Sequence, residues 1–327
     1  MQPGSLVGFG AVFLALTWLA SAVACAGVLA AAARLRAHGP LVERTAATLA
    51  LLLPPVLAAS ATGILAGSSW FNPTDHCASH GHHLHLCLHH GGAWAERTGI
   101  ALAVLGAGLA VAVRTVWLLV RVARAPLAMA RLLAVAEPAW VVGGIPVHLV
   151  PASVPFCFTT GLRTPRIYMA TAAWTRLGER ERQAVLAHEM AHIRQRDLMQ
   201  SLVLAGLAGL GLPGLTGSVR QLWHRATERL CDRHAAADVG EAATVASALL
   251  QLVVSKPDEA RALALAFGPA CAVTERIEAV LAGGPDGQKQ ATLLTSAALA
   301  ATTATFLGAV LWVDPLHHAI ESLLGGH

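Results

Sequence analysis

The sequence predicts an α-helical membrane protein that crosses the bilayer several times and carries one large polar domain. Its 327 residues are 55% hydrophobic and only 13% charged, about half the charged fraction of an average soluble chain. Most of the Lys, Arg, Asp and Glu residues lie between Arg121 and Lys289, so this stretch must meet water. The composition excludes intrinsic disorder and a disulfide-rich secreted domain. A net charge of +4 is too small to indicate nucleic-acid binding.

Four apolar runs are long enough to cross a hydrocarbon core, which takes about 20 residues of helix. They are Ser5–Ala33, Thr45–Thr74, Thr98–Val120 and Gln290–Val313. Pro54 and Pro55 interrupt the second run, which neighbouring helices can tolerate. Arg114 lies near the end of the third run, and we expect its side chain to snorkel to the interface.

The basic residues of the short loops predict the orientation, because Lys and Arg accumulate on the cytoplasmic side. The first loop contains Arg34, Arg36 and Arg44, whereas the second has only Arg97 as a base. We therefore expect three transmembrane helices in residues 1–120, with a His-rich extracellular loop at 71–97. After these helices we expect a cytoplasmic domain at 121–289, a fourth transmembrane helix at 290–313 and a short extracellular tail at 314–327.

A candidate metal-binding motif lies within the polar region. Residues 179–197 read ERERQAVLAHEMAHIRQRD, a predicted helix. His188 and His192 are four residues apart, so their imidazoles project from one helical face and can bind one metal ion. Glu189 could hold a water molecule against that metal. A catalytic zinc ion also needs a third protein ligand and an open position for water.

A third ligand is available in the sequence TERLCDRHAA. Glu228 and Asp232 are four residues apart on a predicted helix. We expect Glu228 to bind the metal and Asp232 to accept a hydrogen bond from a ligating histidine, which would fix the tautomer of that ring. The alternative for this pair is a solvated acidic face beside neighbouring arginines. Together, the two motifs favour one catalytic Zn2+.

A charge-free stretch between the two motifs raises a conflict. Residues 198–219 are apolar enough to cross the membrane, but one crossing would separate Glu228 from His188 and His192. The sequence Gly-Leu-Pro-Gly at 211–214 is a turn signal near the middle of this stretch. We therefore expect a membrane-associated helical hairpin that returns Glu228 to the histidines.

With these residues identified, the sequence resembles the BlaR/MecR-type membrane metallopeptidases. The resemblance covers roughly Pro151–Leu281 and rests on the Pro-Arg-Ile strand, the HEMAH motif with its surroundings and the spaced TERLCD. It implies a gluzincin domain in which His188, His192 and Glu228 hold zinc. It also implies that Glu189 is the catalytic base. Antibiotic-sensing members carry an extracellular penicillin-binding domain where this chain has only residues 314–327, so a β-lactam sensor role is not supported.

We therefore expect an α-helical multi-pass protein of the bacterial plasma membrane with a cytoplasmic, mainly α (α+β) zincin-like metalloprotease domain. The expected function is regulatory cleavage of a BlaI/MecI-type transcriptional repressor in response to an extracellular signal. Its other partner would be membrane lipid, with no direct contact to nucleic acid. The alternative is an HtpX-like protease for misfolded membrane proteins. A non-proteolytic metal transporter is disfavoured because arginines flank HEMAH, whereas transporters bind their ions near the bilayer midplane.

Two features of the mechanism stay open at this level. Residues 165–169 read as a strand whose edge could pair with an extended substrate, although an ordinary packed strand fits as well. The donor that stabilises the oxyanion could be Tyr168, His224 or His234.

The predicted extracellular loop is unusually rich in metal-binding side chains. It holds seven of the sixteen histidines within 16 residues. The candidate ligands are His76, Cys77, His80, His82, His83, His85, Cys87, His89 and His90. Imidazole and thiolate bind zinc and copper. The alternative is a solvated loop with a Cys77–Cys87 disulfide, which an oxidising compartment would favour.

Overall fold

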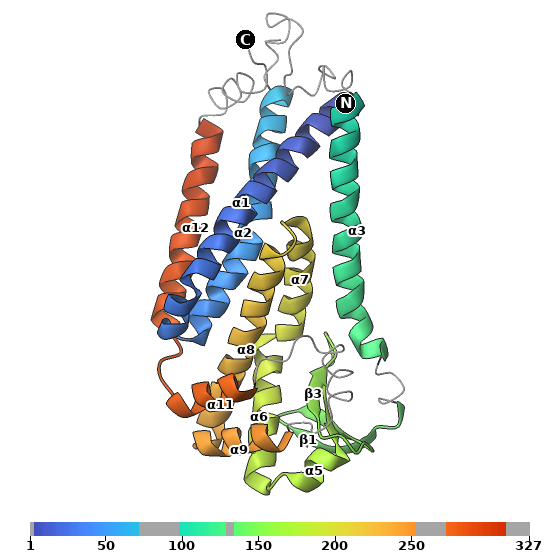
Figure 1. Ribbon diagram of the computed structural model, residues 1–327, viewed down its shortest axis with the longest axis vertical. Helices are drawn as coiled ribbons and strands as arrows, with labels where there is room; N and C mark the ends of the chain where they lie inside the picture. Colours follow the sequence, from blue (N-terminus) through green and yellow to red (C-terminus); the bar gives the residue numbers. More distant parts are fainter. Residues whose placement is uncertain (1–2, 72–97, 129–133, 253–272, 312–327) are drawn as a thin grey trace, which may run out of the picture.

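The computed structural model describes residues 3–71, 98–128, 134–252 and 273–311. Long helices form one half of the molecule, and a small sheet with shorter helices forms the other (Figure 1). This arrangement confirms the predicted fold class, a multi-pass helical protein with an α+β domain.

The long helices are α1 (Pro3–His38), α2 (Pro40–Phe71), α3 (Thr98–Ala128) and α12 (Gln288–Leu311). Each contains an apolar stretch of at least 20 residues, which is enough to cross a bilayer. Helix α2 continues through Pro54 and Pro55, and both α1 and α12 pack against it. Helix α3 extends to Ala128, past the predicted end of the third apolar run.

The sheet contains β1 (Glu137–Val142), β2 (Ile145–Val150), β3 (Cys157–Thr160) and β4 (Arg166–Ala170) in the order β1-β2-β4-β3. Strand β4 runs parallel to β2 and antiparallel to β3, so both of its edges are paired. The hypothesis that residues 165–169 offer a free edge to substrate is therefore wrong. The strand at the edge of the sheet that contacts α6 is β3.

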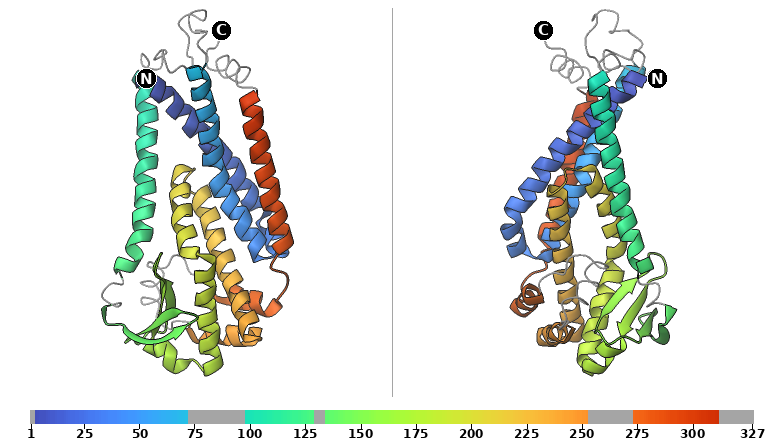
Figure 2. Two further views of the ribbon diagram at one scale, coloured as in Figure 1. Left: turned by 180° about the vertical axis from the view of Figure 1, so that it is seen from behind. Right: turned by 45° about the vertical axis from the view of Figure 1, so that its right-hand side comes forward.

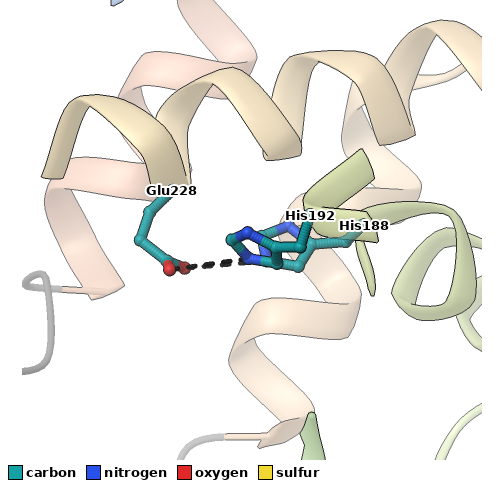
Figure 3. Close-up of side chains that lie close together, drawn as sticks. All are labelled: His188, His192 and Glu228. Atoms are coloured by element: carbon teal, nitrogen blue, oxygen red, sulfur yellow. Dashed lines mark hydrogen bonds and ion pairs between the residues drawn. The ribbon is translucent and has the colours of Figure 1, made fainter. Parts of the chain in front are cut away.

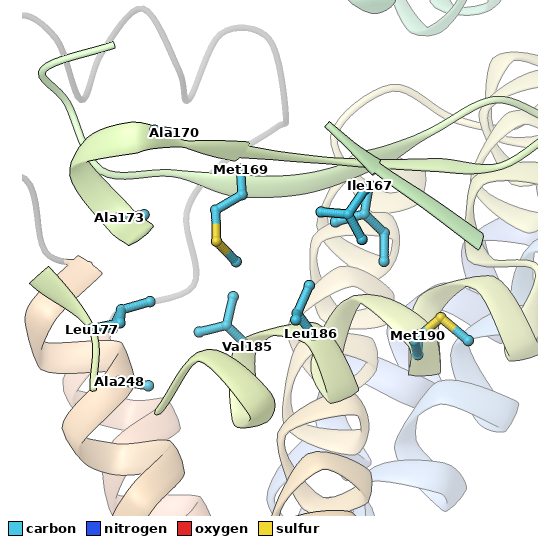
Figure 4. Close-up of a cluster of buried hydrophobic side chains, with 10 residues drawn as sticks. Ile167, Met169, Ala170, Ala173, Leu177, Val185, Leu186, Met190 and Ala248 are labelled. Carbon is cyan, nitrogen blue, oxygen red and sulfur yellow. The ribbon is translucent and has the colours of Figure 1, made fainter. Parts of the chain in front are cut away.

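One face of the sheet packs against α6 (Glu179–Gln195), which carries the HEMAH motif (Figure 4). Alternation along β4 turns Ile167 and Met169 toward α6, where they meet Val185 and Leu186. Ile167 and Met169 are fully buried. This contact fixes the depth and rotation of α6 on the sheet.

A one-residue break follows the motif helix. Helix α6 ends at Gln195, and α7 (Asp197–Leu210) begins two residues later. Arg196 between them has φ 55°, a left-handed conformation that is rare for a residue with a side chain. The helix that carries His192 therefore ends at Gln195 and does not run unbroken to Gly211, because the backbone bends at Arg196.

Helices α7 and α8 (Leu215–Val239) run antiparallel and are joined by a turn at 211–214 (Figure 1). They lie between α3 on one side and α1 with α2 on the other, as the two views in Figure 2 show. Leu204 and Ala208 of α7 and Trp223 of α8 share a buried apolar cluster with Cys25 and Leu51. Helix α8 thus contacts the apolar helix α2 and the motif helix α6.

Arg114 of α3 binds the turn between α7 and α8. Its guanidinium donates to the carbonyl oxygens of Gly211 at 2.5 Å and Gly209 at 3.3 Å, and to Thr216 Oγ1 at 2.9 Å. These contacts replace the expected snorkelling. They satisfy backbone carbonyls that an apolar environment would otherwise leave without a partner.

Candidate active site

Three candidate metal ligands converge where α6 meets α8. The Nε2 atoms of His188 and His192 lie 3.1 Å apart. From α8, the Glu228 carboxylate approaches both rings. Its Oε2 atom lies 3.6 Å from Nε2 of His188, and its Oε1 atom lies 3.6 Å from Nε2 of His192. Figure 3 shows the two rings and the carboxylate turned toward one another. The side chains of His188, His192 and Glu228 are 12%, 20% and 31% exposed, so water can reach the cluster.

The donor set fits a zinc ion. Two imidazole nitrogens and a carboxylate oxygen, all within 4.8 Å of one another, are available on this face. His2Glu is one of the ligand sets that catalytic zinc uses, with a further position left for water or substrate.

The other nitrogen of each imidazole contacts a buried carboxylate. His188 Nδ1 lies 2.9 Å from Asp232 Oδ1, and His192 Nδ1 lies 2.8 Å from Asp197 Oδ2. Such partners fix the tautomer so that Nε2 is free to bind a metal. Sequence analysis singled out Asp232 but missed Asp197, which reaches back to His192 only because the helix breaks at Arg196.

An arginine from α11 (Val273–Ala282) binds both Glu228 and Asp232 of α8. Arg276 contacts Glu228 Oε2 at 3.0 Å and holds Asp232 through two bonds, at 2.6 and 2.8 Å. It offsets the negative charge gathered behind the histidines. Sequence analysis missed this residue, because nothing in its spacing from Glu228 indicates that α11 folds back to α8.

The candidate base, Glu189, faces the edge strand of the sheet. Its side chain is largely buried, and Thr159 of β3 donates a hydrogen bond of 2.7 Å to its Oε2 atom. One carboxylate oxygen is thus held by the protein. Thr159 was not anticipated from the sequence, since its position beside α6 depends on the strand order.

The carboxylates around His188 favour a proton on its ring when no metal is bound. Burial lowers the pKa of His188, but hydrogen bonds to Asp232 and Glu228 outweigh that effect and raise it to about 10. Burial opposes ionisation of Glu228, yet the Arg276 charge and the hydrogen bond from His188 hold its pKa well below its usual range. A proton on His188 therefore occupies the place that a metal would take.

The three candidates for the oxyanion donor lie in different places. Tyr168 stacks between His148 and Phe158 on the sheet face that points away from α6. His234 is bonded to Gln195 through its Nδ1 atom at 3.3 Å. His224 is one helical turn before Glu228 and on the same face. Burial, then the Arg220 charge, lowers the pKa of His224 to about 4, so its ring is neutral.

Cys231 lies behind the histidines. Its Sγ atom is 3.4 Å from His192 Nδ1 and 3.7 Å from Asp197 Oδ2. It thus faces the nitrogen that Asp197 already engages. Burial and the surrounding carboxylates raise the pKa of this thiol well above its usual value, so it stays protonated and is a poor metal ligand.

The second set of predicted ligands lies outside the described residues. This set is the loop group His76, Cys77, His80, His82, His83, His85, Cys87, His89 and His90. Its metal binding and the Cys77–Cys87 disulfide both stay predictions.

Comparison with known proteins identifies the domain that carries this site. The family model of Peptidase family M48 matches residues 121–282. These residues form an M48 peptidase domain. The match begins near the end of α3 and includes the sheet, the motif helix, the α7–α8 pair and all of α11.

Curated relatives are similar to part of this chain. A "Protease HtpX homolog" of Syntrophobacter fumaroxidans is 42% identical over 67 residues, 20% of this chain and 23% of the relative. Homologues with the same name from Burkholderia thailandensis and Burkholderia cenocepacia are 35% and 34% identical over 118 residues, 35% of this chain and 40% of each relative. The chain thus spans less than half the length of these relatives. No solved structure matches.

These comparisons change the balance between the two protease interpretations. The relatives carry the name HtpX, whereas the BlaR/MecR resemblance finds no counterpart among them. The broader expectation, a membrane protein with a metallopeptidase domain, agrees with the M48 match and the four apolar helices. The narrower expectation of a repressor-cleaving regulator gains no support.

Proposed function

We propose that this protein is a zinc-dependent metalloendopeptidase of the bacterial plasma membrane, with an HtpX-like role in cleaving misfolded membrane proteins. The observation that carries the proposal is the convergence of His188, His192 and Glu228 beside Glu189. The M48 match and the HtpX names of the relatives support the same activity. The basic first loop supports a cytoplasmic location for the active site.

The chemistry divides between a metal and the side chains around it. A bound Zn2+ would polarise the scissile carbonyl and make water acidic enough to react near neutral pH. Glu189 would accept the proton of the attacking water and return it to the leaving amine. Thr159 would hold Oε2 of Glu189, leaving Oε1 for the proton. A neutral His224 could donate a hydrogen bond to the developing oxyanion.

Substrate binding is best assigned to the edge of β3. This strand pairs with β4 on one side, and its Thr159 reaches Glu189. An extended peptide added along the other side of β3 would place a backbone carbonyl near Glu189 and the histidines. Recognition through the main chain tolerates many side chains, which suits a protease that removes misfolded proteins.

The transport alternative fits the arrangement less well. The candidate ligands lie on α6, which packs against the sheet, and near the middle of α8, 14 residues past the 211–214 turn. Transporters instead place their ligands between membrane helices near the bilayer midplane. The site therefore favours hydrolysis.

The proposal is tested by proteolysis with purified protein in detergent. With Zn2+ present, wild-type protein should cleave an unfolded membrane protein, and Glu189→Gln should cleave it about 10²–10⁴-fold more slowly, the usual contribution of a general base. Both proteins should hold about one zinc ion at this site. The matched control is Glu179→Gln on the exposed start of the same helix, which should keep full activity.

Two results would contradict the proposal. Cleavage by Glu189→Gln at the wild-type rate would remove the assigned base. Equal zinc content in wild type and Glu228→Ala would remove the assigned ligand. A winged-helix repressor offered in parallel separates the two protease roles, because an HtpX-like enzyme should cut both proteins and a dedicated regulator only the repressor.

A further inference from the structure

The start of helix α2 is connected to the metal ligands by buried ion pairs. Arg44 lies four residues after α2 begins and is 5% exposed. Its guanidinium forms an ion pair with Asp197 Oδ1, and the other oxygen of Asp197 contacts His192 Nδ1 at 2.8 Å. One membrane helix is therefore two contacts away from a candidate metal ligand.

Arg44 also bridges the break between α6 and α7. It donates to the side-chain oxygen of Gln195, the last residue of α6, and at 2.9 Å to that of Gln200 in α7. Its guanidinium carbon lies 5.2 Å from the centre of the buried Trp223 ring. A planar guanidinium can make all these contacts at once, whereas a lysine ammonium cannot.

The residue before Arg44 makes a second buried pair across the same boundary. Glu43 is fully buried and pairs with Arg229, the residue that follows the candidate ligand Glu228. The two pairs hold α2 to both halves of the site, since Asp197 supports a histidine of α6 and Arg229 belongs to α8. Neither contact is needed for topology, which any exposed basic residue could supply.

We propose that Arg44 is a positioning residue of the metal site, through which helix α2 fixes the orientation of His192 by way of Asp197. The inference rests on the proposed zinc-binding function. With Arg44 in place, Asp197 is fixed at one oxygen and accepts from His192 Nδ1 at the other. Without it, Asp197 is free to rotate away, and His192 loses the partner that aims its Nε2 atom at the metal. Displacement of α2 would act on the site in the same way.

The test measures zinc affinity by chelator competition in full-length protein carrying Glu189→Gln, so that no self-cleavage interferes. Arg44→Gln should raise the zinc Kd about 10–100-fold, the usual effect of losing an outer-shell partner. Arg44→Lys, which keeps the charge but not the planar fork, should raise it less. The matched control is Arg34→Gln, an exposed arginine in the last turns of α1, which should leave the Kd unchanged.

A double variant separates positioning from general stability. If Arg44 acts through Asp197, adding Arg44→Gln to Asp197→Asn should raise the zinc Kd no further than Asp197→Asn alone. Active protein gives a second measurement, because Arg44→Lys should lower kcat more than it changes KM for a peptide substrate. If Arg44 only supported folding, its substitution would lower the Tm but would change neither the zinc Kd nor the ratio of kcat to KM.

The outcomes are distinguishable. A wild-type Kd in folded Arg44→Gln, or additive effects in the double variant, would overturn the positioning role while leaving the proposed function intact. If Arg44→Gln does not fold, Arg44→Lys decides, and a wild-type Kd there would overturn the role. Wild-type protein that binds zinc no better than Glu228→Ala would instead overturn the proposed function, and this inference with it.

Discussion

Zinc binding to the metal-free protein should release a proton from His188. Asp232 and Glu228 raise the pKa of this imidazole from 6.5 to about 10, so at pH 7 only about one molecule in 10³ has the neutral ring that a metal requires. The apparent zinc Kd should therefore fall about tenfold for each pH unit between 7 and 9. At pH 8, close to one proton should leave His188 for each zinc ion bound, in addition to protons released by zinc-bound water.

The same shift predicts how stability depends on pH. Because the pKa of His188 is higher in the folded protein, its protonation stabilises the metal-free fold fully below pH 6.5. That contribution is lost as the pH rises from 6.5 through about 10. Zinc-loaded protein has no proton to lose there. The difference in Tm between loaded and metal-free protein should therefore widen as the pH rises over this range.

Calorimetry in buffers of different ionisation enthalpy counts the protons at pH 8. A histidine with the ordinary pKa of about 6.5 is already neutral at that pH and adds no proton to the count. The background should lack Cys77 and Cys87, whose thiols would release protons of their own. As a control, Asp232→Asn should lower the pKa of His188 and release fewer protons. A zinc Kd that does not change between pH 7 and 9 would refute the electrostatic account of the site.

Three other substitutions test separate parts of the structure. Thr159→Val removes the hydrogen bond to Glu189 and should lower kcat about tenfold, a loss of roughly 1.4 kcal/mol, with zinc content unchanged; unchanged kcat would remove Thr159 from the mechanism. Arg114→Leu leaves the turn carbonyls without a donor and should lower the free energy of unfolding by about 1–3 kcal/mol in detergent denaturation, whereas full stability would show that they find other partners. Arg196→Gly should raise the Tm slightly, because a residue with a side chain costs about 1–2 kcal/mol in the left-handed conformation. The greater backbone entropy of glycine in the unfolded chain offsets part of this gain. A lower Tm would mean that the Arg196 side chain stabilises the break between α6 and α7.

Local spacing was sufficient to identify the side chains that meet in the site. Histidines four residues apart lie on one helical face whatever surrounds the helix, and the same period sets Glu228 one turn from Asp232. The Gly-Leu-Pro-Gly turn made it possible to expect both motifs at one place. These inferences depend on periods and turn chemistry within about 40 residues of sequence.

The parts that were missed depend on contacts between distant segments. Strand order decides that Thr159, and not residues 165–169, lies at the edge beside Glu189. The left-handed Arg196 has no glycine to mark it, yet it alone returns Asp197 to His192. Arg44 was interpreted only as a basic residue of a cytoplasmic loop, because its charge explains topology without reference to any partner.

The buried pairs across α2 show that the M48 domain is not a self-contained unit. Residues 121–282 include Asp197 and Arg229 but not their partners, Arg44 and Glu43. Breaking a buried ion pair by removing one member costs about 3–5 kcal/mol. Two such losses are comparable to the whole stability of a typical domain, about 5–15 kcal/mol. Helix α2 therefore contributes buried contacts to the candidate site, and the metal site proposed at His192 should depend on them.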